Sequence, residues 1–483
     1  MRHSLLAVLT LFLLGVGLRA QSAQVGVDPR VELMSIIFRL AGANEYSQGR
    51  IPAYNAAIDK WFGPHRDHEA VRIARELHEH QGVGFDAVMS MAIHVKDVES
   101  LAEIVPFDRD NSFDKRWRVA EARRFLAAAR KFVTDSDFAG FVKSEQPFYD
   151  SVDARLRAYV AAKADLEWFD RFFGSRTHAP FHLVPGLVNG GPSYGPHVTL
   201  ADGVEEIYAI PGVWKVDSDG LPVFDASWGA IVVHEFSHSY ANPLIDKFAL
   251  QLDKSGGRLL EAVREQMRRQ AYENGRTVLY ESLVRAVVAR YILEHQGQKA
   301  AAAEVSEQRN RSFLWTGDLL ALLDQYAKNR ERYPTMQSFM PRLVEFFNDT
   351  ASRVDELARV YEESRPKVLS MSIANGATDV DPALKEIVVR FDRPMDRGRF
   401  GINDIAAAPS PKMGKASFDD SGRVFTVAVA LEPNRDYGFT LNWPEGDVFQ
   451  SAGGVPLKPF EVKFRTRADS ESTARPPDGK PAR

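Results

Sequence analysis

The sequence has no cysteine, little net charge and, after its first twenty residues, no long apolar run. Without cysteine among 483 residues, disulfide bonds, thiolate metal ligands and the lipid anchor of a lipoprotein are excluded. A formal net charge of −4 gives no electrostatic reason to expect binding to nucleic acid. What the sequence does have is 45% hydrophobic residues, which is ample for the cores of a large globular protein.

The first twenty residues have the layout of a secretory signal peptide. Arg2 and His3 precede an apolar run from Leu5 to Leu18, and Ala20 stands before polar residues. We expect cleavage near Ala20 and no membrane span after it. The alternative is an uncleaved anchor, but the run is shorter than the roughly 20 residues that a spanning helix needs.

The segment His234-Glu235-Phe236-Ser237-His238 is an HExxH motif in an apolar stretch. Residues four apart share a face of an α-helix, so the two imidazoles can hold one metal ion while Glu235 lies beside it. Two neutral imidazoles suit Zn²⁺, and a neighbouring carboxylate can take a proton from water at the metal. The helix is expected to start at an N-cap, either Asp225 or Ser227, and to stop at Pro243. The alternative is a surface helix with an incidental His-Glu-His.

A catalytic zinc site needs a third protein ligand. Leu244 occupies the position where an HExxHxxGxxH site would have its third histidine, so the ligand must come from farther along. Gly256-Gly257 is expected to interrupt the helical pattern. The later helical stretch Thr277 to His295 carries Glu281 on an apolar face, so Glu281 is the candidate ligand. The alternative role for Glu281 is a surface ion pair with Arg285. The other carboxylates in reach are Glu273, Glu261 and Asp246.

Helical periodicity from Val31 to about Phe173 predicts a region of packed helices before this motif. From Pro180 to Val223, short β-branched and aromatic runs broken by glycine and proline predict a small sheet. Within it, the glycine- and proline-rich segment Asn189–Thr199 is typical of a sheet edge or of an ordinary turn-rich loop. As an edge, it could pair with an extended peptide.

These features together resemble the gluzincin metallopeptidases, the thermolysin-like group. The resemblance implies a zincin-like region in which His234, His238 and Glu281 bind zinc and Glu235 is general base and acid. These enzymes often place an aspartate four residues after the ligand glutamate, whereas this chain has Arg285. The segment Leu33–Leu40 followed by Ala41-Gly42, the HExxH motif and Glu281–Arg285 are together similar to a family of exported bacterial proteins known only as a domain of unknown function. That similarity implies no substrate. The signal-peptide layout predicts a secreted or periplasmic location.

A reaction at a peptide carbonyl also needs a donor for the developing oxyanion. Tyr280, next to the expected ligand, is the candidate catalytic residue for this role, and the alternative, which its residue type favours, is a packing aromatic. The other donors within reach are Tyr194, Tyr240, Tyr291, Arg285 and His295.

Alternating runs from Val368 to Thr466 predict a separate β-sandwich, and Asn375 to Asp396 resembles bacterial immunoglobulin-like domains. Such a domain could contact a cell surface or a polymer. The expected α+β organisation is therefore a signal peptide (1–20), an N-terminal helical region (21–175), a mainly helical zincin-like region with a helical lobe (176–366), an all-β immunoglobulin-like sandwich (367–467) and a disordered tail (468–483).

The function expected from these patterns is a secreted zinc metallopeptidase that hydrolyses peptide or protein substrates. Two alternatives stay open. One is a degenerate zincin that serves as a surface binding or adhesion protein, and the other is a zinc hydrolase of non-peptide amides or esters.

Overall fold

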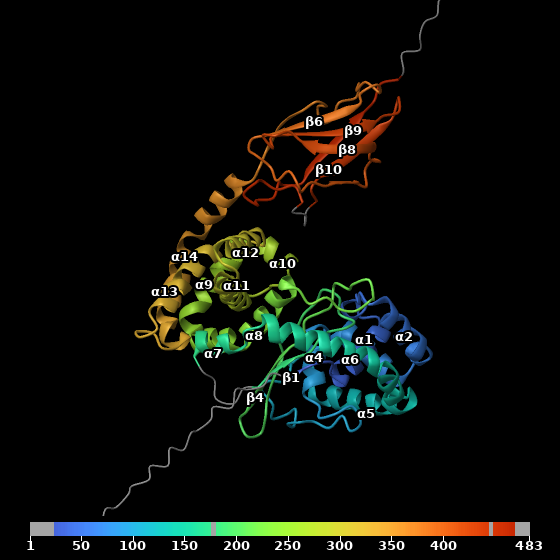
Figure 1. The fold of residues 1–483 in the computed structure, drawn as a ribbon, viewed down its shortest axis with the longest axis vertical. Coiled ribbons are helices and arrows are strands. Elements are labelled where there is room, and N and C mark those ends of the chain that lie inside the picture. Colours follow the sequence, from blue (N-terminus) through green and yellow to red (C-terminus); the bar gives the residue numbers. More distant parts are fainter. Residues whose placement is uncertain (1–23, 175–179, 444–447, 469–483) are drawn as a thin grey trace, which may run out of the picture. The chain divides into compact units, whose positions relative to one another are not determined.

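The computed structural model describes residues 24–174, 180–443 and 448–468. The expected signal peptide and the expected tail beyond residue 468 lie outside these residues. The described chain has an α+β fold and divides into two compact units (Figure 1). Unit 1 takes in the residues up to Lys247 together with Asn329–Phe339, and unit 2 takes in Phe248–Lys328 and the residues from Met340 onward.

The core of unit 1 is built around helix α1 (Pro29–Ala41), which is buried along almost its whole length. The Asp28 side chain accepts a hydrogen bond from the Arg30 backbone N–H at its start, and Gly42 ends it with a φ of 93° that glycine tolerates without strain. The other helices of this region are α2 (Pro52–Phe62), α3 (Glu69–Gln81), α4 (Asp86–Ile93), α5 (Val119–Asp135), α6 (Phe138–Lys163) and α7 (Glu167–Phe173). They confirm the helical periodicity of residues 31–173.

A small sheet follows these helices, as expected. Its strands, in spatial order, are β1 (Gln24–Val25), β2 (Phe181–Leu183), β4 (Glu205–Ala209) and β3 (His197–Thr199). Strand β2 is parallel to β4, whereas β3 is antiparallel to β4 and forms one edge of the sheet. The glycine- and proline-rich segment therefore supplies an edge strand, where proline's missing N–H does no harm.

Helix α8 (Ala226–Lys247) carries the HExxH motif and packs against β4. The prediction that Pro243 ends this helix is wrong, because α8 continues through Pro243 for a further turn. Proline disfavours a helical conformation in the preceding residue but does not forbid it. Burial of Ile245 in that last turn gives a tertiary reason for the helix to continue.

The helical part of unit 2 is arranged around α11 (Gly275–Gln296), which packs against three of its neighbours, α9, α12 and α13. The remaining helices are α9 (Ala249–Ala262), α10 (Arg264–Arg269), α12 (Gln298–Asn310), α13 (Thr316–Lys328) and α14 (Met336–Ser364), whose residues before Met340 belong to unit 1. The prediction of a break at Gly256-Gly257 is wrong, because α9 runs through both glycines. A Cβ on Gly256 would lie 2.5 Å from the Gly275 carbonyl oxygen, so glycine here permits close packing of α9 on α11.

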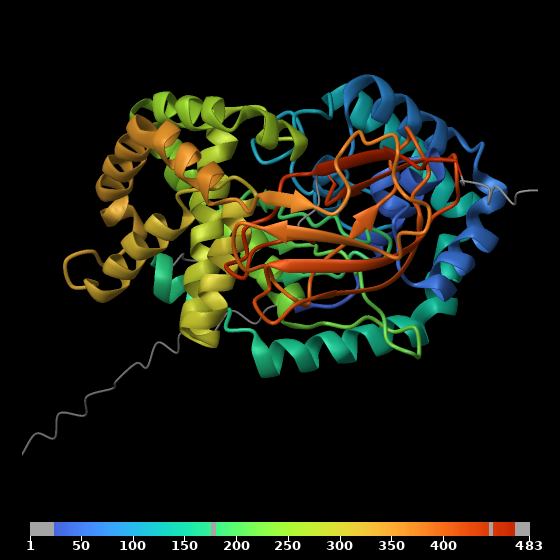
Figure 2. The same ribbon diagram turned by 90° about the horizontal axis from the view of Figure 1, so that it is seen from above.

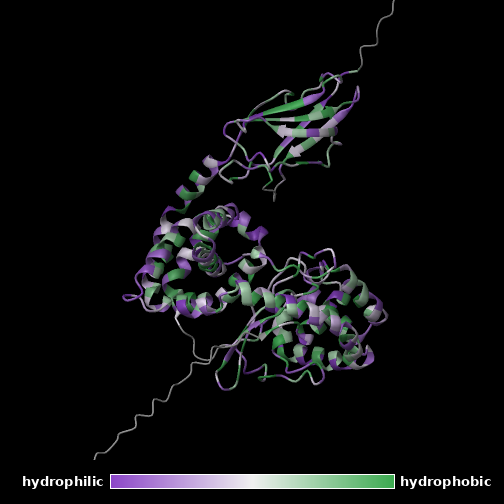
Figure 3. Ribbon diagram, in the orientation of Figure 1, coloured by the Kyte–Doolittle hydropathy of each residue, from purple (hydrophilic) through white to green (hydrophobic). Residues whose placement is uncertain are grey.

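The C-terminal part of unit 2 forms the expected immunoglobulin-like sandwich. One sheet has the strand order β5-β6-β9-β8 and the other β11-β10-β7. The strands of the sandwich are drawn in orange and red in Figures 1 and 2. The strands are β5 (Val368–Met371), β6 (Glu386–Phe391), β7 (Ile402–Asn403), β8 (Lys412–Phe418), β9 (Val424–Ala430), β10 (Asp436–Leu441) and β11 (Phe460–Arg465). Along β9, every second side chain enters the core, and hydrophobic and hydrophilic residues are mixed along the strands (Figure 3).

Hydrogen bonds join the sandwich to the helices of unit 2. The Asn310 side chain donates to the Gly454 carbonyl at 2.8 Å, and Arg365 donates to the Pro456 carbonyl at 3.1 Å. Among the described helices, none combines the length and the apolar character that crossing a bilayer requires.

Candidate metal centre

Helix α8 is fixed at its N-terminus by a cap and a buried tryptophan. The Asp225 carboxylate accepts hydrogen bonds from the backbone N–H groups of Ser227 and Trp228, so Asp225, not Ser227, is the N-cap. The Trp228 indole donates to the Gly212 carbonyl at 3.1 Å. These contacts hold the start of the helix against the segment before it and thereby set the positions of the residues two turns on.

The two histidines of the motif converge on one point. The Nε2 atoms of His234 and His238 are 3.2 Å apart. His238 Nδ1 lies 3.2 Å from the Oδ1 atom of Asn242, an acceptor that favours the proton on Nδ1 and leaves the lone pair on Nε2. Asn242 is one turn after His238, so this partner could have been found from helical spacing alone.

Glu281 belongs to the same cluster. It lies on α11, and its carboxylate and the ring nitrogens of His234 and His238 offer ligand atoms that all lie within 4.8 Å of one another. This is the one such group of three metal-binding side chains within residues 24–174, 180–443 and 448–468. The other carboxylates considered from the sequence, Glu273, Glu261 and Asp246, are exposed.

The donor set fits a zinc ion. Two nitrogens bound to a tetrahedral zinc at about 2.05 Å are about 3.3 Å apart, close to the 3.2 Å between the two Nε2 atoms. Two imidazoles and one carboxylate are also the ligands of many catalytic zinc sites, which keep one position open. The side chains could therefore hold zinc with little rearrangement of the two rings.

Glu235 is buried, with 8% of its surface exposed, and it lies against the sheet edge. A Cβ added to Gly195 would be 2.9 Å from the Glu235 carbonyl oxygen and 3.0 Å from its carboxylate Oε2. Only glycine allows this approach without displacement of one of the two residues. No local sequence pattern indicates the contact, because the two residues are far apart in the chain.

Glu281 pairs with Arg285, but not on the surface. Arg285 Nη2 lies 2.9 Å from Glu281 Oε2, and both side chains are less than a tenth exposed. Burial alone would lower the pKa of Arg285, but the charge of Glu281 raises it above the usual value, so the guanidinium stays charged. The alternative prediction, an ion pair on the helix surface, is therefore wrong, because the pair is buried.

The expected oxyanion donors differ in their surroundings. Tyr280 is half-buried on α11 beside Glu281, and its catalytic role stays a prediction. Tyr240 donates to Asp170 and stacks on Phe173. His295 stacks on Tyr291 and contacts its carbonyl.

Tyr194, next to Gly195, is buried, and burial raises the pKa of its hydroxyl well above the usual value, as does, to a smaller extent, the charge of Glu235. Its hydroxyl therefore stays protonated in the field of Glu235.

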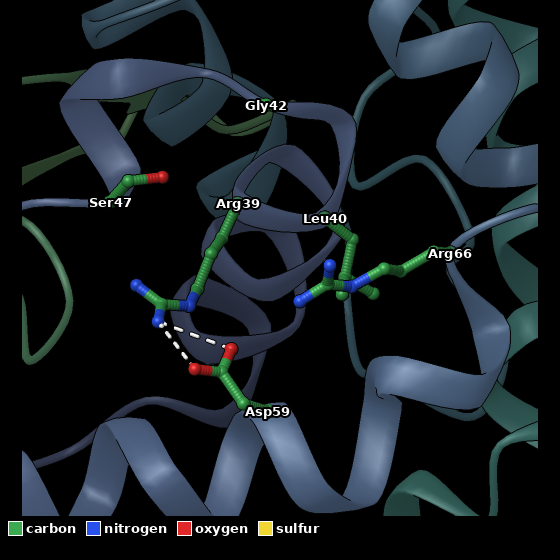
Figure 4. Close-up of a pocket in the computed structure, with 6 residues that line it drawn as sticks. All are labelled: Arg39, Leu40, Gly42, Ser47, Asp59 and Arg66. Carbon is green, nitrogen blue, oxygen red and sulfur yellow. Dashed lines mark hydrogen bonds and ion pairs between the residues drawn. The ribbon is translucent and has the colours of Figure 1, made fainter.

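A hollow of about 310 Å³ lies elsewhere in unit 1, around the end of α1 (Figure 4). Its lining includes Arg39, Ser47, Asp59 and Arg66. Arg39 donates to both carboxylate oxygens of Asp59 at 3.2 Å (Figure 4), which offsets its charge. None of the metal-centre residues lines this hollow.

Comparison with solved structures finds only distant similarity. A structure of surface layer protein SbsC, domains 1–6, is 16% identical over 51% of this chain and 35% of that chain, with a TM-score of 0.17. The N-terminal part of the bacterial S-layer protein SbsC is 15% identical over 51% and 61%, with a TM-score of 0.16. The chain thus covers less than two thirds of each of these proteins, and scores this low carry no structural conclusion.

Comparison with protein families gives two matches, whereas no curated protein matches the chain. Residues 362–466 match the bacterial Ig-like domain, as the sandwich indicates. Residues 23–346, which include all the metal-centre residues, match a family described as a domain of unknown function, and this confirms that part of the resemblance seen in the sequence. The chain belongs to this family, DUF4932, and carries a bacterial immunoglobulin-like domain after it.

Proposed function

We propose that the protein is a zinc-dependent peptide hydrolase with a zincin-like centre of the gluzincin type. The observation that carries the proposal is that His234, His238 and Glu281 offer ligand atoms within 4.8 Å of one another, with the buried Glu235 next to His234 in the chain. Two imidazoles and one carboxylate at one point are a donor set that suits a catalytic zinc ion.

A zinc ion held by these side chains would act as a Lewis acid and lower the pKa of water toward neutrality. The chain's own residues have distinct tasks in the proposal. His234 and His238 would bind through Nε2, with Asn242 orienting the second ring. Glu235 would accept a proton from the attacking water at its carboxylate and return it to the departing amine.

The substrate would bind along strand β3. An extended peptide can pair with the edge of a sheet through main-chain hydrogen bonds. The Thr199 N–H at one end of β3 already donates to Ser112 Oγ at 3.1 Å, so a substrate would extend from there toward Gly195. That direction brings its backbone to Glu235, which Gly195 touches.

Location and partners follow from the same proposal. The apolar N-terminal segment supports export, and an exported hydrolase would meet peptides or proteins outside the cytoplasm. The immunoglobulin-like sandwich would act as a spacer or as a contact to a cell surface or polymer.

The test is hydrolysis of a diverse peptide library by zinc-loaded wild type, Glu235→Gln and Asp246→Asn. Loss of the general base should lower kcat by about 10²- to 10⁴-fold with zinc content unchanged. Asp246→Asn, an exposed change on the same helix, should leave activity near that of the wild type. A zinc-loaded wild type as inactive as Glu235→Gln would refute peptidase function.

A further inference from the structure

The ion pair between Glu281 and Arg285 is buried far more deeply than its spacing requires. The two side chains are 8% and 7% exposed, and Nη2 and Oε2 are 2.9 Å apart. An i,i+4 pair of this kind on a helix surface stabilises only weakly. Removing both charges from water costs much more unless further polar groups compensate, so the surroundings of Arg285 decide what the pair does.

Arg285 is held on several sides by groups from other segments of unit 2. Its Nη1 donates to Gln308 Oε1 at 2.5 Å, and its Nη2 donates to the Tyr272 hydroxyl at 3.0 Å. The guanidinium carbon lies 4.5 Å from the centroid of the Phe313 ring. Gln308 is itself fixed, because its amide donates to Glu304 at 2.6 Å. A guanidinium with this many partners has one orientation.

The carboxylate of Glu281 has two oxygens, and the ion pair engages one of them. An arginine that holds Oε2 limits rotation of the carboxylate, and the same carboxylate offers a ligand atom to the cluster with His234 and His238. Partners that orient a metal ligand in this way typically change metal affinity by about 10- to 100-fold when they are removed. In the gluzincin resemblance, an aspartate often stands at the position of Arg285 and orients a histidine, so this chain has the opposite charge there.

We infer that Arg285 is a positioning residue for Glu281: fixed by Tyr272, Gln308 and Phe313, it holds one carboxylate oxygen and leaves the other to a divalent metal. The inference rests on the proposed metal centre. The competing possibility is that Arg285 competes with the metal for the carboxylate, in which case its removal would tighten metal binding. The two possibilities predict opposite changes in affinity.

The experiment measures the zinc dissociation constant by competition with a chromophoric chelator, which requires no catalytic activity. Arg285→Met removes the charge and should weaken zinc binding by about 10- to 100-fold. Arg285→Lys keeps the charge without the planar fork and should fall between wild type and Arg285→Met. Arg290→Met is the matched control, because Arg290 pairs with Glu294 on the same helix at 3.1 Å, and its zinc affinity should equal that of the wild type.

Thermal unfolding of each metal-free variant shows whether it folds. If Arg285→Met does not fold, Gln308→Leu replaces it, since this change frees Arg285 without touching Glu281 and should weaken zinc binding by about two- to tenfold. Zinc binding that is tighter or unchanged in the folded variants would overturn the inference. If the zinc affinities of wild type, Arg285→Lys and Arg285→Met follow the expected order but the wild type cleaves no peptide, the proposed function is refuted. The role of Arg285 would still stand.

Discussion

At the scale of single residues, the contact between Gly195 and Glu235 links the sheet edge to the proposed general base. Glycine leaves room there for the Glu235 carboxylate and its backbone carbonyl, which would lie 3.0 and 2.9 Å from an added Cβ. At 2.9 Å from the carbonyl oxygen an added Cβ requires a shift of the backbone, and at 3.0 Å from Oε2 it requires a small shift of the carboxylate. The position of the carboxylate therefore depends on the absence of a side chain at residue 195.

Gly195→Ala should lower kcat/KM for peptide cleavage by about 10- to 100-fold, because a displacement of about 1 Å at a reacting group can cost that much. Zinc content should not change, since the three atoms nearest to the added Cβ all belong to Glu235, which is not a proposed ligand. Gly191→Ala is the matched control from the same segment, where an added Cβ meets nothing within 4 Å. Equal activity of the two variants would contradict the placement of Glu235 by Gly195.

The sequence predicts those residues of the centre that are related by helical spacing. His234 and His238 are four apart, and the same rule relates Glu281 to Arg285, so both pairs could be recognised before the structure was known. The rule does not predict burial, so the alternative that puts the Glu281–Arg285 pair on the surface is wrong. Tyr272, Gln308 and Gly195 come from other segments, and no local pattern connects them with the centre.

At the scale of elements, close packing of α9 on α11 supports the helix that carries Glu281. The carbonyl carbon of Gly256 would lie only 2.4 Å from a Cβ on Gly275, and Gly256 has an equally short approach to the Gly275 oxygen. Glycine in a helix interior costs about 0.5–1 kcal/mol relative to alanine. At Gly256 this cost is offset because only glycine allows α9 to pack this closely on α11.

Gly256→Ala and Gly257→Ala should therefore have opposite effects on stability. Gly256→Ala should destabilise by about 1–3 kcal/mol through overpacking, whereas Gly257→Ala meets nothing within 4 Å and should stabilise by about 0.5–1 kcal/mol. Thermal unfolding measures both changes. The same sign for both variants would show that α9 and α11 are not in close contact at Gly256.

Three residues that favour helix ends lie inside helices of this protein. Pro243 and the Gly256-Gly257 pair both have the chemistry of helix ends, and the helices run through all three. In each case a tertiary contact, burial of Ile245 or packing on Gly275, outweighs the local preference. The alternating runs of the sandwich do form the predicted strands, because side chains that alternate with a period of two fit a core between two sheets.

At the scale of the whole molecule, the N-terminal helical region contains a buried carboxyl group that makes its stability depend on pH. Glu32 on α1 accepts a hydrogen bond from Tyr54 at 2.5 Å, and Tyr54 contacts the Tyr149 hydroxyl at 2.8 Å. Burial raises the pKa of Glu32 from 4.5 to about 8, although the Tyr54 hydrogen bond opposes this. At neutral pH the carboxyl group is therefore protonated in the folded protein.

The pKa of Glu32 is higher in the folded protein than in the unfolded chain. The contribution of its protonated carboxyl group to the free energy of unfolding is therefore fully present below pH 4.5 and is lost as pH rises through about 8. The difference between the folded and unfolded pKa values of Glu32 corresponds to at most roughly 5 kcal/mol of unfolding free energy. Glu32→Gln keeps a neutral acceptor and should lose less stability between pH 6 and pH 9 than the wild type in thermal unfolding. Exposed Glu79→Gln should follow the wild type, and a Glu32→Gln curve parallel to both would contradict the buried carboxyl.

The central claim for the molecule is that His234, His238 and Glu281 form one metal site. Elemental analysis after dialysis against a weak chelator, with X-ray absorption at the zinc edge, tests it most directly. The claim predicts about one zinc per chain bound by two imidazoles and a carboxylate, loss of zinc in His234→Ala and in Glu281→Ala, and full retention in Glu273→Ala. A wild type without zinc, or a Glu281→Ala variant that keeps it as tightly as the wild type, would contradict the claim.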